Sequence, residues 1–274
     1  MRMSCPVGLV LPFVLTGAMG IAVAEDEAPA MPPRKTFKEA FKTFARDGGY
    51  LMSFPARTNA KGVWLTVAVG AATALTIGRD EEIREQVLES DSRTLGRVAT
   101  KFEPLGRTEV QAAALGTLYL AARGARNERL VSAAATAFES YLWSMLITSV
   151  VKGAFGREAP NRGSGEGEFF AGETIFPSGH TSRSFAIAAV FADRYGHKAA
   201  FVGYPVAALI GWSTVQEDKH WASDVVAGVG LGLAIGKGIV ARHPRPEAAT
   251  AAGSSKVAWD VVPGQGGAAL RISF

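Results

Sequence analysis

Long apolar stretches constrain this sequence more than any other feature, because each must be buried against another stretch or in lipid. They span residues 63–77, 110–122, 131–151, 184–192 together with 199–215, and 225–241. Their length predicts helices, and several approach the roughly 20 residues that cross a bilayer. Charged residues interrupt or flank them, so we expect an all-α, multi-helix bundle over residues 63–241 and favour its embedding in a membrane.

The last apolar stretch carries a regular set of glycines. Gly228, Gly232 and Gly236 are four residues apart and therefore share one face of a helix. Such small-residue faces let two helices approach closely, as they do in membrane bundles. We expect this helix to pack tightly against another helix of the bundle.

The first 24 residues resemble a secretory signal peptide. Arg2 supplies the positive start, residues 7–14 are almost wholly apolar, and Ala22-Val23-Ala24 has the small-x-small form of a cleavage site. An uncleaved first membrane helix is the alternative. We expect export to the periplasmic side of a bacterial membrane, with embedded or peripheral attachment. Cleavage would remove Cys5, the only cysteine, which excludes disulfides and cysteine nucleophiles from the mature protein.

The segments around and within the bundle have other patterns. Residues 25–62 begin as a polar, mobile leader and continue over 36–46 as an amphipathic helix, which either lies in the lipid interface or covers the core. Residues 79–109 are dense in charge and predict a solvated connection with a short surface helix. Residues 242–256 predict a linker, and residues 257–274 alternate around a PGQGG turn, which predicts a small C-terminal β-hairpin.

The charge of the chain argues against one class of partner. There are 29 Lys and Arg against 25 Asp and Glu, a formal net charge of +4. The basic residues are dispersed among acidic ones and are not interleaved with aromatic residues, so no nucleic-acid surface is indicated. A weak preference for phosphorylated substrates or anionic lipid headgroups is what this balance supports.

Two of the four histidines lie in patterns that suit phosphate chemistry. The first is Pro177-Ser178-Gly179-His180 at the entry to an apolar helix, where backbone N–H groups and the helix dipole bind anions. Its serine adds a hydroxyl donor and its histidine a titratable proton. In the second, Asp224 follows His220 by four residues, so a carboxylate can orient the imidazole. Taken alone, each pattern also fits a structural role, a helix cap or a helix-start salt bridge.

Together these residues resemble the three motifs of the type 2 phosphatidic acid phosphatase and vanadium haloperoxidase superfamily. The family's first motif, a lysine followed after six residues by Arg-Pro, corresponds to Lys152 with Ala159-Pro160. The second motif, Pro-Ser-Gly-His, is complete at 177–180. The third, Ser-Arg followed by His and Asp, corresponds to Ser213-Thr214 with His220 and Asp224. The order and spacing agree over residues 110–241.

The resemblance implies the family's helical fold and a hydrolase that needs no cofactor and no metal. His220 would attack phosphorus and form a phosphohistidine, Asp224 would orient it, and His180 would protonate the leaving oxygen. The phosphoryl oxygens would be held by Lys152, Ser178 and the Gly179 N–H. The residue types taken by themselves point to the same roles.

Two positions depart from the family pattern, because its arginines are replaced by Ala159 and Thr214. Arginine binds phosphate bidentately, and a charge-assisted contact contributes about 1.5–3 kcal/mol, so we expect weakened rather than abolished turnover. Arg157 and Arg183 are the candidate substitutes in substrate binding. The alternatives are that Arg157 binds a nearby carboxylate and that Arg183 faces solvent.

The sequence therefore predicts a phosphatase for a phosphate monoester or diphosphate, carried by a lipid or isoprenoid. A soluble periplasmic acid phosphatase of broad specificity is one alternative. A degenerate member that binds phosphate or lipid without turnover is another. Haloperoxidase activity is the least favoured, because it depends on the same cationic ligands that are missing. No metal-ligand cluster is visible in the sequence, and nothing in it indicates an oligomeric state.

Overall fold

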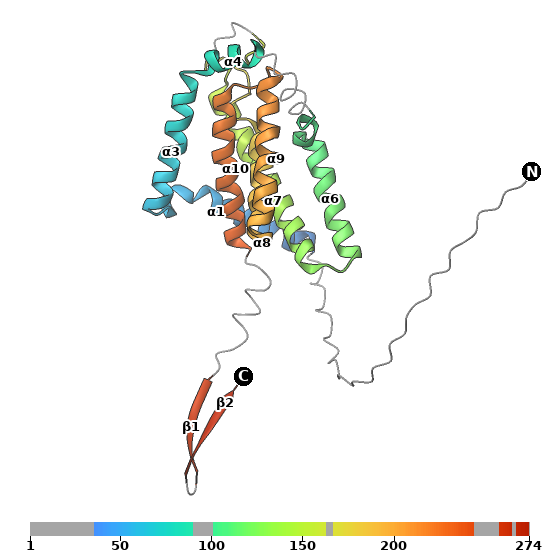
Figure 1. Ribbon diagram of the computed structural model, residues 1–274, viewed down its shortest axis with the longest axis vertical. Coiled ribbons are helices and arrows are strands. Elements are labelled where there is room, and N and C mark those ends of the chain that lie inside the picture. Colours follow the sequence, from blue (N-terminus) through green and yellow to red (C-terminus); the bar gives the residue numbers. More distant parts are fainter. Residues whose placement is uncertain (1–35, 90–100, 163–166, 244–257, 265–266, 274) are drawn as a thin grey trace, which may run out of the picture. The chain divides into compact units, whose positions relative to one another are not determined.

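The computed structural model describes residues 36–89, 101–162, 167–243, 258–264 and 267–273 (Figure 1). Its helices are α1 (Phe37–Met52), α2 (Phe54–Arg57), α3 (Ala60–Ile77), α4 (Asp80–Glu89), the 3₁₀ helix η1 (Glu103–Gly106), α6 (Thr108–Gly124), α7 (Glu128–Phe155), α8 (Gly179–Tyr195), α9 (His197–Gln216) and α10 (Ala222–Arg242). Every predicted apolar stretch lies inside one of these helices. The expectation of an all-α bundle is confirmed.

The longest helix, α7, has well-defined ends. The Asn127 side chain accepts a hydrogen bond from the Leu130 N–H (2.9 Å) and caps the start. Gly156 ends the helix with a φ of 52°, a left-handed conformation that glycine adopts without steric cost. Lys152 lies in the last turn, so the glycine stop fixes where its side chain leaves the helix.

The central helix of the bundle is α8, which packs against α7, α9 and α10 (Figure 1). Toward α6 and α7, one buried cluster consists of Leu115, Ala137, Tyr141 and Val190. Toward α9, a second consists of Phe185, Ala188 and Ala207. Full burial of each large apolar side chain contributes about 1.5–3 kcal/mol, so α8 carries much of the packing energy of the bundle.

The glycine face of α10 lies directly against α8. A Cβ atom added to Gly228 would lie 2.8 Å from the carbonyl oxygen of Ser178, and one added to Gly236 would lie 2.7 Å from that of Ala186. A Cβ on Gly232 would collide with the carbonyl oxygen of Ser182. The predicted close helix approach is confirmed, and α8 is the partner.

Three helices have the length and apolar composition of membrane spans: α3, α7 and α10. Most apolar side chains of α3 are exposed, among them Trp64 (71%) and Leu75 (74%). The amphipathic α1 exposes Phe37 and Phe41 but packs Phe44 on the Trp143 ring, with 4.4 Å between ring centroids. Part of α1 therefore covers the core, while its first turns present aromatic rings outward.

The segments before and after the bundle, and the segment 79–109, are described only in part. The segment 79–109 is more than the solvated connection that its charge predicts, because Asp80 and Glu103 are buried. Strand β1 (Ala258–Gly264) pairs in antiparallel register with β2 (Gly267–Ser273), at the position where the sequence predicts a hairpin. The predicted signal peptide and leader, and residues 244–256 of the predicted linker, lie outside the described residues.

Candidate active site

The three motifs come together where α7 ends and where α8 and α10 begin. A Cβ atom added to Gly179 would lie 3.8 Å from Lys152 Cε and 3.0 Å from Arg183 Nη1. The Ser178 N–H donates a hydrogen bond to the carbonyl oxygen of Asp224 (2.9 Å). Residues on three different helices therefore share one site.

His220 lies in the short connection between α9 and α10. Its Nδ1 is 3.2 Å from Oδ2 of Asp224, whose side chain is fully buried and also accepts the Trp221 N–H (3.0 Å). Donation of Nδ1–H to the carboxylate leaves the lone pair on Nε2. Burial lowers the pKa of His220, against the opposing effect of its hydrogen bond with Asp224. The ring is therefore held neutral, with the lone pair of Nε2 available to a ligand.

His180 is the second residue of α8. Its Nε2 is buried and has no hydrogen-bond partner among the described residues, and the nearby Glu103 Oε1 is 3.8 Å away. Leaving a buried polar atom unpaired costs about 1–3 kcal/mol, so such an atom calls for an explanation such as ligand binding. Burial, together with the charge of Arg183, lowers the pKa of His180 to about 4. Nε2 can therefore bond to a ligand oxygen that enters the site.

The turn ahead of α8 supplies the anion-binding geometry that the sequence predicts. Ser178 caps the helix, because its Oγ accepts hydrogen bonds from the Thr181 N–H (3.4 Å) and from the Thr181 hydroxyl (2.9 Å). Gly179 is the first residue of α8, and the first N–H groups of a helix have no partner within the helix. The positive end of the α8 dipole therefore lies beside Lys152 and Arg183.

Two cationic side chains approach this turn. The Lys152 ammonium donates to the carbonyl oxygens of Thr174 (2.7 Å) and Ile175 (2.9 Å), which uses two of its three donors. Arg183 is buried, and its Nε and Nη2 donate to Gln111 Oε1 (3.2 Å) and the Gly106 carbonyl oxygen (3.0 Å). Its Nη1 is the atom closest to Gly179. The alternative that Arg183 faces solvent is wrong.

Arg157 lies apart from that turn, with only 2% of its surface exposed. Its Nη1 donates to Asp224 Oδ1 (2.7 Å) and Ser223 Oγ (2.6 Å), and its Nη2 to Asp80 Oδ2 (2.8 Å). Of the two possibilities that the sequence leaves open, the structure has the carboxylate pairing. Arg157 contacts the carboxylate that pairs with His220, and the expectation that it also contacts substrate stays a prediction.

Two buried acidic residues near the site are not predicted from the sequence. Asp80 Oδ1 accepts the Ser223 N–H (2.9 Å), which anchors α4 to the start of α10. Glu103 accepts a hydrogen bond from Lys219 (3.0 Å). Burial raises the pKa of Glu103, but its hydrogen bonds with Lys219 and Arg107 outweigh this effect and lower the pKa. These partners are 143 and 116 residues away in sequence, and no local pattern signals them.

The two positions that lack the family's arginines have structural contacts instead. The Ala159 N–H donates to Glu173 Oε2 (2.9 Å). Thr214 is fully buried, and its hydroxyl donates to the Gly211 carbonyl oxygen (2.7 Å). The Thr214 carbonyl oxygen accepts the His220 N–H (3.2 Å), so this residue helps to hold the turn that carries His220.

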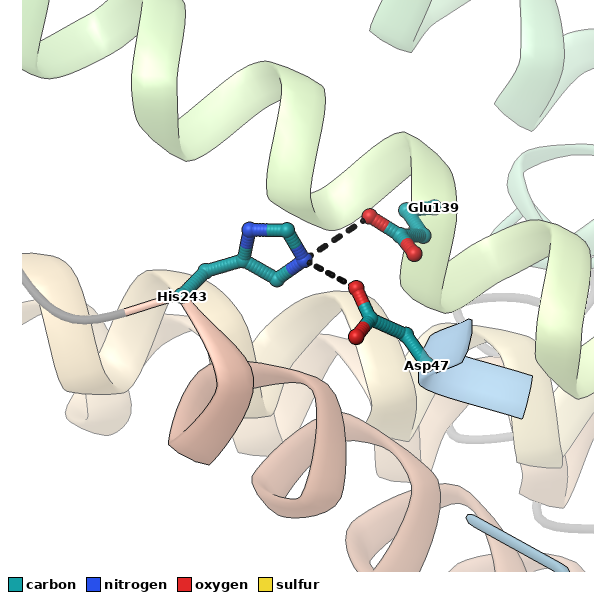
Figure 2. A group of neighbouring side chains, drawn as sticks. All are labelled: Asp47, Glu139 and His243. Atoms are coloured by element: carbon teal, nitrogen blue, oxygen red, sulfur yellow. Dashed lines mark hydrogen bonds and ion pairs between the residues drawn. The ribbon is translucent and has the colours of Figure 1, made fainter. Parts of the chain in front are cut away.

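A second group of titratable side chains lies outside the candidate site. His243, directly after α10, has its Nε2 2.9 Å from Asp47 Oδ2 and 3.0 Å from Glu139 Oε2 (Figure 2). The three possible ligand atoms lie within 4.8 Å of one another. The sequence shows no metal-ligand cluster, because Asp47 and His243 are 196 residues apart. The sequence-based expectation that no metal is bound therefore stays a prediction.

Residues 133–248 match the family model described as the PAP2 superfamily. This segment contains Lys152, the complete motif at 177–180, and the His220 and Asp224 pair. This segment, residues 133–248, belongs to the PAP2 superfamily. The resemblance seen in the three sequence motifs is thereby confirmed.

The chain is similar to two known proteins. Over 65 residues it is 40% identical to a lipid A 1-phosphatase of Porphyromonas gingivalis. That stretch is 23% of this chain, and the chain spans only 15% of the length of that curated relative. The crystal structure of a transmembrane PAP2-type phosphatidylglycerolphosphate phosphatase from Bacillus subtilis aligns with a TM-score of 0.47 and 18% identity, over 73% of this chain and 94% of the other.

Proposed function

We propose that this PAP2 protein hydrolyses a phosphate monoester or diphosphate through a phosphohistidine formed on His220. The observation that carries the proposal is the pairing of His220 Nδ1 with the buried Asp224, together with the unpartnered Nε2 of His180. One ring is prepared to attack, because its Nε2 lone pair is free. The other has an unbonded nitrogen where a leaving group would need a proton.

In the first step, Nε2 of His220 forms a bond to phosphorus while the bond from phosphorus to the leaving oxygen breaks. His180, protonated at Nε2, gives its proton to that oxygen. In the second step, His180 takes a proton from water, the water oxygen attacks phosphorus, and the bond to His220 breaks to release phosphate. Because a bound phosphate places negative charge beside His180, it raises the low pKa of this residue toward the value that an acid catalyst needs.

Charge on the transferred oxygens is stabilised by the turn that begins α8. Lys152 has one donor beyond those bound to the Thr174 and Ile175 carbonyl oxygens, and Arg183 Nη1 lies next to Gly179. Both cations and the helix dipole act in a largely buried site, where electrostatic stabilisation is strongest. Of the two candidate substitutes for the missing arginines, Arg183 is the one whose position fits substrate binding.

The substrate proposed is a lipid or isoprenoid phosphate, with the site at the periplasmic side of a membrane. Support comes from the three apolar helices of spanning length and from the exposed aromatic rings of α3 and α1. The predicted signal segment adds export. The 40% identical relative is a lipid A 1-phosphatase, which is consistent with a phosphorylated lipid as substrate.

A phosphate-release assay tests this proposal. Purified protein is assayed against phosphatidate, undecaprenyl diphosphate and p-nitrophenyl phosphate, with detergent and without it. We expect the two lipid substrates to be preferred and detergent to be required. Preference for p-nitrophenyl phosphate without detergent would favour a soluble, broad-specificity phosphatase.

A second candidate function, phosphate or lipid binding without turnover, rests on Ala159 and Thr214. Restoring both arginines should raise kcat/KM about tenfold or more, if each guanidinium returns about 1 kcal/mol to the transition state. Because Thr214 is fully buried, a melting temperature must accompany each assay. A folded protein that binds phosphate but shows no activity before or after the change would favour the binding-only function.

A further inference from the structure

We propose that Asp47, Glu139 and His243 form a binding site for a divalent transition-metal ion such as Zn²⁺. They come from α1, from α7 and from the residue after α10, so three distant parts of the chain converge on one point (Figure 2). An imidazole nitrogen with two carboxylate oxygens is a ligand set that zinc takes in proteins.

The distances in this cluster fit a cation better than a shared proton. Nε2 of His243 is 2.9 Å from Asp47 Oδ2 and 3.0 Å from Glu139 Oε2, but a single Nε2–H points along one direction and cannot donate well to both. Ligand atoms around a tetrahedral zinc ion lie about 3.3 Å apart, given metal–ligand bonds near 2.0–2.1 Å. The two distances from His243 would open by a few tenths of an ångström, and the two carboxylate oxygens, which lie within 4.8 Å of each other, would adjust around the ion.

The outer carboxylate oxygens supply two further arguments. Asp47 Oδ1 accepts a hydrogen bond from Arg242 Nε (2.9 Å), the kind of contact that orients a metal-ligating carboxylate. Glu139 Oε1 is buried and has no hydrogen-bond partner among the described residues. A cation bound by both oxygens of Glu139 would satisfy this atom, which is otherwise costly to bury.

The local charge also favours a cation. Asp47 and Glu139 contribute two negative charges, Arg242 contributes one positive charge, and a neutral imidazole contributes none, so the group has one negative charge in excess. Arg194 also approaches and donates to the main-chain carbonyl oxygen of His243. The side chains of Glu139 (16% exposed) and His243 (23% exposed) reach solvent, so water can complete the coordination.

The ion would have a structural role, because it would fasten α1 to α7 and to the end of α10. The site is separate from the proposed phosphate chemistry, which uses the C-terminal end of α7 and the start of α10. Its test is therefore independent of whether the protein is a phosphatase.

The experiment measures zinc bound per chain in full-length, tag-free protein in detergent. The chain has four histidines, and those of the candidate active site could bind zinc themselves, so the parent protein carries His180→Gln and His220→Gln. It is treated with a chelator, exchanged into buffer with ZnCl₂, gel-filtered and analysed by mass spectrometry for metal. We expect one equivalent of zinc in the parent and a higher melting temperature with zinc than without it.

Two added substitutions and one control decide the assignment. Glu139→Gln keeps the side-chain shape and His243→Gln removes the nitrogen, and each should abolish the retained equivalent. His197→Gln removes an exposed histidine elsewhere and should retain it. Equal amounts of bound zinc in the parent and in both variants would overturn the proposal. A parent that retains no zinc would also overturn it, since the cluster would then be a proton-bridged ion pair. If a variant unfolds, the visible absorption spectrum of the Co²⁺-loaded parent is the alternative test. A spectrum identical to that of the free aqueous ion would also overturn the proposed site.

Discussion

The two ends of α10 each place a histidine against carboxylates, and the two histidines have opposite environments. His220, just before the helix, meets one carboxylate, Asp224, whose charge is already shared with Arg157, and burial lowers its pKa. His243, just after the helix, meets two, and its hydrogen bond with Glu139 raises its pKa. The helix has 21 residues, so about 30 Å separate the two ends.

This difference suggests what distinguishes the proposed nucleophile from a structural histidine in one fold. A single carboxylate that is itself neutralised by an arginine orients the ring but does not stabilise a second proton on it. Two carboxylates with one arginine that is 31% exposed stabilise a positive charge on the ring or a bound metal ion. The number and the pairing of the carboxylates, rather than the presence of histidine, therefore separate the two sites.

Removal of the proposed nucleophile should have the largest effect on turnover among the variants that compare the two ends of α10. His220→Ala should lower turnover by about 10⁴-fold or more, because no other described group beside Asp224 can form the covalent intermediate. Acid quenching with radiolabelled substrate should trap a phosphoprotein in the wild type and none in this variant. His243→Ala should still yield the phosphoprotein. A phosphoprotein of normal yield in His220→Ala would refute the assignment.

Converting a carboxylate to its amide at each end should sharpen the contrast. Asp224→Asn should lower kcat by about 10²–10⁴-fold, because the imidazole loses its orientation and charge support. Glu139→Gln should lower the melting temperature and leave kcat nearly unchanged. Both variants are compared by steady-state kinetics and thermal unfolding. If Asp224→Asn affects only stability, this residue is a helix cap and the ends are alike.

The arginines at the two ends should differ in their contribution to stability. Arg157→Ala leaves the buried Asp80 and Asp224 without their shared cation, and should lower the free energy of unfolding by about 3–5 kcal/mol. Arg242→Ala removes a side chain that is 31% exposed, so about 1 kcal/mol is expected. Denaturant unfolding in detergent measures both. Equal losses would mean that the network around Arg157 is no more than a surface ion pair.

The pH dependence of stability should run in opposite directions at the two ends. The raised pKa of His243 adds stability that is fully present below about pH 6.5 and is lost as the pH rises through that raised value. The pKa of His180 is lowered to about 4, so its contribution is fully present above about pH 6.5 and is lost as the pH falls toward 4.

Melting temperatures of the wild type, His243→Gln and His180→Gln across pH 4–9 would reveal this smallest effect. The advantage of the wild type over His243→Gln should shrink at high pH. Relative to His180→Gln, the wild type should lose stability as the pH falls below 6.5. Three parallel curves would show that neither histidine has a perturbed pKa.

The sequence predicts the helices and the reacting residues because their signals are local. Apolar stretches determine the helices, and the spacing of His220 and Asp224 places both on one side of a helix start. Long-range pairing has no such signal. Whether Arg157 meets phosphate or a carboxylate depends on Asp80, which lies 77 residues earlier in the sequence. The same limit hides the Asp47 and His243 contact, since residues 196 apart share no pattern.

The hydrogen bond from Ser178 to Asp224 also has a consequence for biosynthesis. The chain is made from its N-terminus, so Lys152 and His180 leave the ribosome before His220 and Asp224. A nascent chain that ends before His220 holds the proposed acid and the cations but lacks the imidazole that we propose as the nucleophile. Under the proposed mechanism, the site is complete only when the glycine face of α10 docks on α8 and this hydrogen bond forms. We therefore expect the unfinished protein to be inert toward phosphate esters.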